Sequence, residues 1–163
     1  MLLALFNREE VAIAVKAELP KYAVILNPTD SSKASELATL QAVYLAKLSG
    51  AQLVPVFVVD ESVARRACVN VRQAMERITK KGHEVLSSIK ALGERNGVAV
   101  TPLLVEGQTA PTILKIASDQ SASLIVIGRT AFTDIDHLLA RPISISEEVL
   151  EGALCPVLVI KGS

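Results

Sequence analysis

The chain has 163 residues, of which 50% are hydrophobic and only 3% aromatic, and its 17 basic side chains are balanced by 17 acidic ones. A domain of this length buries about two-thirds of its unfolded surface, and here the core must consist of Val, Ile, Leu and Ala. The zero net charge and the scarcity of aromatic residues argue against nucleic acid and against an anionic membrane as partners.

The first 20 residues form a segment of their own. Residues 2–17 place apolar side chains near one helical face, and Pro20 ends the pattern, so we expect an N-terminal helix that packs on the domain or on a partner subunit. Its polar face is not rich in Lys or Arg, which argues against a membrane-surface anchor. The segment lacks the features of a signal peptide, and no window reaches the roughly 18 apolar residues of a membrane span.

Cysteine usage is sparse. Cys68 and Cys155 lie far apart, and neither is near His83 or His137 at a metal-ligand spacing. We therefore expect two free thiols, no metal site and a cytoplasmic location.

From residue 21 to residue 163 the chain is predicted to be one domain, in which short apolar runs alternate with helical patterns. After the first strand, Asp30 or Ser31 can cap a helix that Gly50 closes. A long helical pattern follows the second strand, with Gly82 as a candidate break, and Thr109 is the expected cap of the next helix. The five strands are expected at residues 22–27, 51–60, 98–106, 123–128 and 155–160.

This alternation of strands and helices predicts an α/β fold: a doubly wound parallel sheet with helices on both faces. Pro102 argues that the third strand lies at a sheet edge, and Pro55 is expected near the start of the second strand. In such sheets, ligands bind beyond the carboxyl ends of the strands, where the strand order reverses. That rule selects the segments PTD and GRTA, which follow the first and fourth strands.

The common catalytic motifs are absent. The sequence contains no G-x-G-x-x-G, no P-loop and no G-x-S-x-G elbow. Glu147 and Glu148 are adjacent on a predicted helix and do not face each other. His83 lies in a polar helical stretch and His137 in the loop after the fourth strand, and the sequence shows no pair of a nucleophile with a base. We therefore predict that the protein is not an enzyme.

Four segments in sequence order resemble the universal stress protein family: NPTDSS, VVDE, LIVIGR and SEEVLEGALCPVLVI. The resemblance covers about residues 21–161. It implies a five-stranded parallel sheet in the order 3-2-1-4-5, of the adenine nucleotide alpha hydrolase-like type. It also implies a homodimer in which the strands at Val157–Ile160 pair antiparallel, which would cover an exposed edge strand.

One branch of this family binds ATP through a loop after the fourth strand, with the pattern Gly, two residues, Gly, nine residues, Gly, then Ser or Thr. Gly128 matches the first glycine, whereas the second position is Ala131. Counting forward places Arg141 at the third glycine; counting back from the helix places Ile143 there, with Ser144 as the hydroxyl. The loop thus carries a two-residue insertion. Alanine in a left-handed conformation costs about 1 kcal/mol, but a large side chain at the third glycine occupies the space of the phosphate.

The resemblance implies that Asp30 contacts the nucleoside and that the backbone of Val58 meets the adenine. The alternatives are that Asp30 only caps a helix and that Val58 only fills the core. Ser144 and Ser146 lie at a helix N-terminus, which favours an anion, and Arg129 or Arg141 can add positive charge. The full candidate set is Pro28, Thr29, Asp30, Val58, Gly128, Arg129, Ala131, Ser144, Ile145 and Ser146.

Two functions remain open. In the first, the protein is a dimeric cytoplasmic regulatory or interaction protein whose altered loop no longer binds ATP tightly, so that no cofactor is firmly held. In the second, it is an adenine-nucleotide sensor that binds ATP (with Mg²⁺) or AMP through the altered loop.

Overall fold

The computed structural model describes residues 19–67, 70–129 and 144–162. The expected N-terminal helix lies outside these ranges, as do Ala131, Cys68 and His137, and so do the two alternatives for the third glycine of the loop. The described elements are, in chain order, β1 (Val24–Pro28), α2 (Lys33–Ser49), β2 (Gln52–Val59), α3 (Glu61–Ala67), α4 (Val71–Arg95), β3 (Leu103–Glu106), α5 (Thr109–Asp119), β4 (Leu124–Arg129), α7 (Ile145–Gly152) and β5 (Val157–Lys161).

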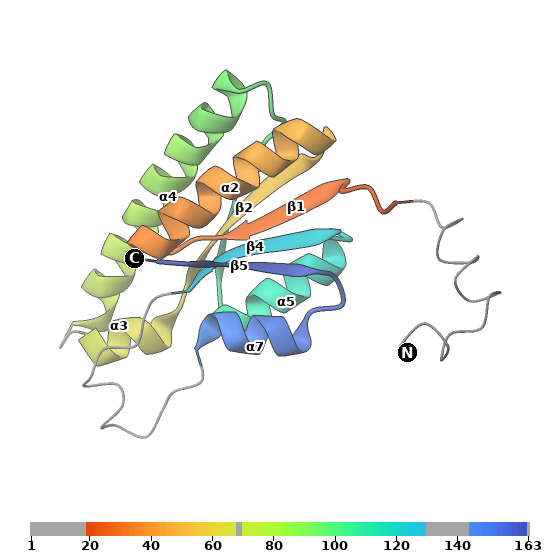
Figure 1. The fold of residues 1–163 in the computed structure, drawn as a ribbon. Coiled ribbons are helices and arrows are strands. Elements are labelled where there is room, and N and C mark those ends of the chain that lie inside the picture. Colours follow the sequence, from red (N-terminus) through yellow and green to blue (C-terminus); the bar gives the residue numbers. More distant parts are fainter. Residues whose placement is uncertain (1–18, 68–69, 130–143, 163) are drawn as a thin grey trace, which may run out of the picture.

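The five strands form one parallel sheet in the order β3-β2-β1-β4-β5, which confirms the expected fold and the edge position of the third strand. Helices α2 and α4 cover one face of the sheet, and α5 and α7 cover the other (Figure 1). The strand order reverses at β1, which lies between β2 and β4. The carboxyl ends of these three strands therefore open a crevice between the two helical layers.

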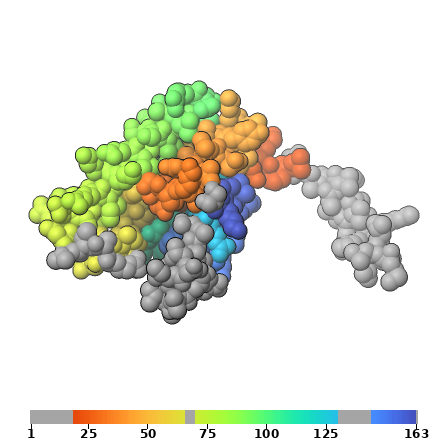
Figure 2. All heavy atoms as spheres, turned by 60° about the vertical axis from the view of Figure 1, so that its left-hand side comes forward, coloured from red at the N-terminus to blue at the C-terminus, as the bar shows by residue number. Residues whose placement is uncertain are grey.

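The core has two aliphatic layers, one on each face of the sheet. Helix α2 places a row of alanines against the sheet, at Ala38, Ala42 and Ala46, and these small side chains allow close packing. Figure 2 shows the side on which α2 (orange) lies beside the long helix α4 (yellow to green). The other layer is formed by branched residues of the strands with α5 and α7, including Val54, Val56, Ile113, Ile125 and Val149.

A buried asparagine joins three elements at the point where the strand order reverses. Asn27 of β1 is fully buried, and its Nδ2 donates a hydrogen bond to the carbonyl of Val126 in β4 at 2.9 Å. Its Oδ1 accepts a hydrogen bond from the Thr39 hydroxyl of α2 at 2.8 Å. Both polar atoms of the side chain therefore have a partner, and the two hydrogen bonds join the end of β1 to β4 and α2.

Gly82 does not break the helix that follows β2, which corrects the expectation from the sequence. It lies within α4, and a Cβ at this position would come within 2.7 Å of the side chains of Phe57 and Leu104. The glycine therefore lets α4 lie directly on β2 and β3. The interruption occurs earlier, between α3 and α4.

Pro55 lies in the middle of β2 rather than near its start. Its nitrogen faces β3, because the Leu53 amide donates to the Ala99 carbonyl on that side at 2.8 Å and amides alternate along a strand. The β2–β3 ladder is interrupted beside Pro55, and Pro102 lies in the same gap. The missing amide donors therefore coincide with a break in pairing at the sheet edge.

Helix α2 is capped by Ser32, and not by Asp30 or Ser31 as expected. The Ser32 hydroxyl accepts a hydrogen bond from the Ser35 amide at 3.2 Å. Ser31 has a φ of 65°, in the left-handed region, so the chain turns sharply just before the helix. Gly50 ends the helix with a φ of 70°, as expected.

Within the described ranges, every helix is too short or too polar to cross a bilayer.

Candidate functional site

A cleft of about 1090 Å³ lies at the carboxyl ends of β1, β2 and β4. Eight of the ten candidate residues line it, and they come from the β1–α2 turn, the end of β2, the end of β4 and the start of α7. Of the other two, Arg129 is adjacent to the lining residue Gly128, and Ala131 lies outside the described residues. The eight are Pro28, Thr29, Asp30, Val58, Gly128, Ser144, Ile145 and Ser146.

The turn after β1 presents one carboxylate to the cleft. Thr29 is buried, and its amide donates to the carbonyl of Val56 at 2.9 Å, which anchors the turn to β2. Asp30 is exposed, and its Oδ1 accepts a hydrogen bond from the Ser32 amide at 2.9 Å. Its second carboxylate oxygen forms no hydrogen bond with another described residue, which leaves an acceptor at the mouth of the cleft.

Gly128 permits close contact between β4 and α2. A Cβ at this position would lie 2.5 Å from the carbonyl carbon of Ala34 and 2.6 Å from the amide nitrogen of Ser35. Both atoms belong to the backbone of the first turn of α2, so they cannot move aside independently of the helix. The glycine is therefore required by packing whether or not a phosphate binds, a role that the loop pattern alone could not reveal.

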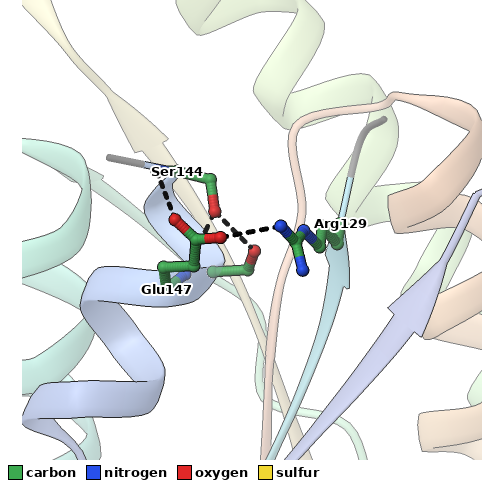
Figure 3. Close-up of polar contacts among 4 residues, drawn as sticks. Arg129, Ser144 and Glu147 are labelled. Carbon is green, nitrogen blue, oxygen red and sulfur yellow. Dashed lines mark hydrogen bonds and ion pairs between the residues drawn. The ribbon is translucent and has the colours of Figure 1, made fainter. Parts of the chain in front are cut away.

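Helix α7 begins with a capping box. The Ser144 hydroxyl accepts a hydrogen bond from the Glu147 amide at 3.2 Å, and the Glu147 Oε2 accepts one from the Ser144 amide at 3.4 Å (Figure 3). The hydroxyls of Ser144 and Ser146 lie 3.1 Å apart, and Ser146 is buried. The start of α7 is thus already hydrogen-bonded to a carboxylate of the same helix, that of Glu147.

Arg129 donates a hydrogen bond from a terminal guanidinium nitrogen to Oε1 of the same glutamate, Glu147, at 2.7 Å (Figure 3). The two side chains are 40% and 36% exposed, so solvent screens this ion pair in part. The positive charge that the sequence suggested for a phosphate is thus paired with a carboxylate on α7.

Asp60 holds the starts of two helices, which the sequence did not reveal. Its Oδ1 accepts a hydrogen bond from the Ser62 amide at 2.9 Å. Its Oδ2 accepts two hydrogen bonds from Thr109, one from the amide at 3.0 Å and one from the hydroxyl at 2.9 Å. Burial raises the pKa of Asp60, but the hydrogen bonds from Ser62 and Thr109 outweigh burial and bring the pKa below its ordinary value.

Thr109 is not the cap of α5 that the sequence suggested. It is the first residue of the helix, and Gln108 occupies the cap position without a side-chain hydrogen bond to the helix. The Asp60 carboxylate satisfies the Thr109 amide instead. An acidic residue after β2 and a threonine at a helix start were visible in the sequence, but their contact spans 49 residues.

Helix α4 also contributes to the cleft, through Arg77, Ile78 and Lys81. The sequence interpretation assigned no site role to this helix. The only signal was the placement of two basic residues four positions apart, which puts them on one helical face. His83, on the same helix, is exposed and does not line the cleft.

In the parts of the chain that the structure describes, no three His, Cys, Asp or Glu side chains come together as a metal site. Cys155 is a free thiol that is partly buried, and burial raises its pKa. The polar chemistry of the described cleft is therefore that of hydroxyls, carboxylates, amides and two cations.

Comparison with known proteins identifies the family. The universal stress protein family model matches residues 21–161. A universal stress protein of Methanocaldococcus jannaschii is 34% identical over 142 residues, which cover 86% of this chain and 82% of the relative. A solved structure of a universal stress protein family member from Burkholderia pseudomallei is 32% identical, with a TM-score of 0.68, and the match covers 85% of this chain and 96% of that one.

A more distant solved structure has the same fold. A universal stress protein from Archaeoglobus fulgidus, solved in complex with dAMP, is 18% identical with a TM-score of 0.61, and the match covers 88% of this chain and 100% of that one. The motifs at the strand ends, the strand order and the match over residues 21–161 agree. The chain belongs to the universal stress protein family.

Proposed function

We propose that the protein binds an adenine nucleotide in the cleft and acts as a cytoplasmic regulatory protein rather than as an enzyme. One observation carries the proposal: a single cleft brings together Asp30, Val58 and the start of α7 from three separate parts of the chain. This cleft lies where the strand order reverses, the usual ligand position in such sheets. The dAMP complex of the Archaeoglobus fulgidus protein, which has the same fold, supports the choice of ligand.

The backbone of Val58 is suited to recognise the adenine ring. Val58 lies two residues beyond the last hydrogen bond between β1 and β2, from the Thr29 amide to the Val56 carbonyl at 2.9 Å. Because backbone groups alternate along a strand, the N–H and C=O of Val58 also face the β1 side, past the end of that strand. They can therefore pair with the donor and acceptor edge of a base.

The ribose and phosphates then lie between Asp30 and the start of α7. The free oxygen of the Asp30 carboxylate is a suitable acceptor for a ribose hydroxyl. The helix start offers amides and hydroxyls to a phosphate, but Glu147 already occupies the Ser144 amide and pairs with Arg129. We infer that the grip on a phosphate is weak at this end, in keeping with a regulatory ligand that is bound and released.

The absence of catalysis is part of the proposal. In the described cleft, Asp60 is the carboxylate with a lowered pKa, and both of its oxygens accept hydrogen bonds from helix ends. A group held in this way is a poor general base for the attack of water on a phosphate.

A homodimer through β5 is a second proposal, and it depends on the sheet edge. β5 is an outer strand of the sheet, and apolar residues on and beside it are exposed, with Leu158 at 37% and Leu154 at 97%. Antiparallel pairing of Val157–Ile160 with the same strand of a second copy would cover this edge.

Calorimetric titration with AMP and with ATP, in the presence and absence of Mg²⁺, tests nucleotide binding. We expect saturable binding by the parent protein and at least tenfold weaker binding by Asp30→Ala, since a hydrogen bond to a charged group contributes about 1.5–3 kcal/mol. Asp119→Ala is the matched control, because Asp119 is an exposed carboxylate on α5 that does not line the cleft. No binding by the parent at millimolar nucleotide would contradict the proposal.

A further inference from the structure

Two cationic side chains of α4, Arg77 and Lys81, line the cleft. Helix α4 lies on the face of the sheet opposite to α7. Arg77 and Lys81 lie four residues apart and therefore on one face of the helix. The neighbouring Gly82 is seated against Phe57 and Leu104, so the sheet holds this part of α4 in place. The two cationic side chains are exposed, and they extend from a helix that this packing holds in place.

Within the described residues, the charges of these two side chains have no ionic partner. On the same helix, Arg72 and Lys90 each pair with a glutamate four positions later. By contrast, Arg77 and Lys81 form no ion pair and no side-chain hydrogen bond with another described residue. Like charges at this spacing repel each other, which opposes helix formation. Two cations on one helical face that line a cleft, with no carboxylate partner among the described residues, indicate a site for an anion.

The carboxylates of the cleft do not neutralise the pair. Asp60 accepts hydrogen bonds from backbone amides at the starts of α3 and α5, and Asp30 accepts one from the Ser32 amide. Neither they nor Glu148, which also lines the cleft, lies within 4.0 Å of a cationic nitrogen of α4. On the opposite side, Arg129 is paired with Glu147. Among the described lining residues, the cationic side chains are those of α4.

We propose that Arg77 and Lys81 bind the phosphate end of the adenine nucleotide from the α4 side of the cleft. This inference rests on the proposed nucleotide binding and assigns the charge that the start of α7 does not supply. The planar guanidinium of Arg77 can donate two parallel hydrogen bonds to phosphate oxygens, and the ammonium of Lys81 adds a compact charge. The ligand is accordingly a phosphorylated adenosine, and affinity rises with the negative charge on its phosphates.

The test is a calorimetric titration of adenosine, AMP and ADP into the parent protein and into Arg77→Gln and Lys81→Gln. Lys80→Gln is the matched control, since it removes the same charge from the adjacent, exposed position of α4 and does not line the cleft. We expect each cleft variant to bind AMP and ADP about tenfold more weakly, a difference of ~1.4 kcal/mol, and adenosine within about twofold of the parent. The control should bind all three ligands like the parent.

The outcomes separate the two proposals. If both cleft variants bound AMP and ADP as tightly as the parent protein does, the role of α4 would be overturned and the proposed nucleotide binding would stand. Equal weakening for adenosine and for ADP would also overturn it, because the side chains would then shape the pocket rather than bind phosphate. If the parent bound none of the three ligands, the proposed function would fail, and the α4 site with it. Thermal unfolding of each variant confirms that these exposed substitutions leave the fold intact.

Discussion

Single carboxylates hold the helix ends that surround the cleft. Asp60 joins the starts of α3 and α5, and Glu147 joins the start of α7 to Arg129 at the end of β4. The amide groups at a helix start otherwise lack partners, so each carboxylate satisfies donors that the helices leave open. The shape of the cleft therefore depends on two carboxylates, those of Asp60 and Glu147, whose oxygens all accept hydrogen bonds.

Replacing Asp60 by Asn should destabilise the protein near neutral pH by about 1 kcal/mol, because the amide keeps one acceptor oxygen but its nitrogen cannot accept the two hydrogen bonds from Thr109. Although burial raises its pKa, hydrogen bonds from Ser62 and Thr109 hold the pKa of Asp60 below its ordinary value of 3.8 in the folded protein. The folded state then binds fewer protons than the unfolded state in acid. The stabilisation is complete above the unfolded-state pKa and is lost as the pH falls through the lower folded-state value.

Urea unfolding of the parent and of Asp60→Asn, near neutral pH and at about pH 3, measures this effect. The stability deficit of the variant should be smaller in acid than at neutral pH. A stability deficit of the same size at both pH values would show that the charge of the Asp60 carboxylate contributes nothing to stability.

Gly128→Ala should lower the free energy of unfolding by about 1–3 kcal/mol, the range for overpacking. The new Cβ would meet backbone atoms of α2 at 2.5–2.6 Å, and relief requires the helix to move away from β4. Gly152→Ala is the control, because there the added carbon meets only the side chain of Leu114, which can rotate. Equal stability losses in the two variants, by urea unfolding, would argue against the close contact of β4 and α2.

At the scale of elements, strands were easier to predict than helix limits. Four of the apolar runs match strands of the sheet to within two residues at each end, because a strand buried on both faces requires consecutive apolar side chains. The third run, expected at residues 98–106, forms a strand only over Leu103–Glu106, after the gap in pairing beside Pro102. The helix that was expected to break at Gly82 continues, since Phe57 and Leu104 occupy the space beside it. That space is created by tertiary packing, which local propensity does not encode.

The exposed edge strand β5 allows the proposed dimer to be tested by a single substitution. Leu158 is 37% exposed, whereas Val157 and Val159 pack on the core layer of α5 and α7. In an antiparallel two-fold pair of β5 strands, lysines at position 158 of both copies would lie near each other and repel. Leu158→Lys should therefore yield monomers from a dimeric parent in light scattering.

Leu48→Lys serves as the control for the dimer, because Leu48 is 66% exposed at the end of α2 and lies outside β5. This variant should keep the oligomeric state of the parent. A dimer that survives Leu158→Lys but dissociates with Leu48→Lys would place the interface on α2 instead.

In the whole molecule, the cleft lies where the strand order reverses, and the position of this cleft could be predicted from the sequence. The rule for parallel sheets, together with the family resemblance, selected Asp30, Val58 and Ser144 from three distant segments, and all three line one cleft. The contribution of α4 could not be predicted. Arg77 and Lys81 line the cleft because the packing of Gly82 on Phe57 and Leu104 holds this part of α4 against β2 and β3, which local sequence does not encode.

Nucleotide binding in the cleft is tested most directly by titrating isotope-labelled protein with AMP and following the chemical shifts of the backbone amides. If AMP binds in the cleft, the largest changes occur at Thr29, Asp30, Val58 and residues 144–146, at the carboxyl ends of β1 and β2 and the start of α7. Changes confined to the β5 edge or to the outer face of α2, or no change at millimolar AMP, would contradict it.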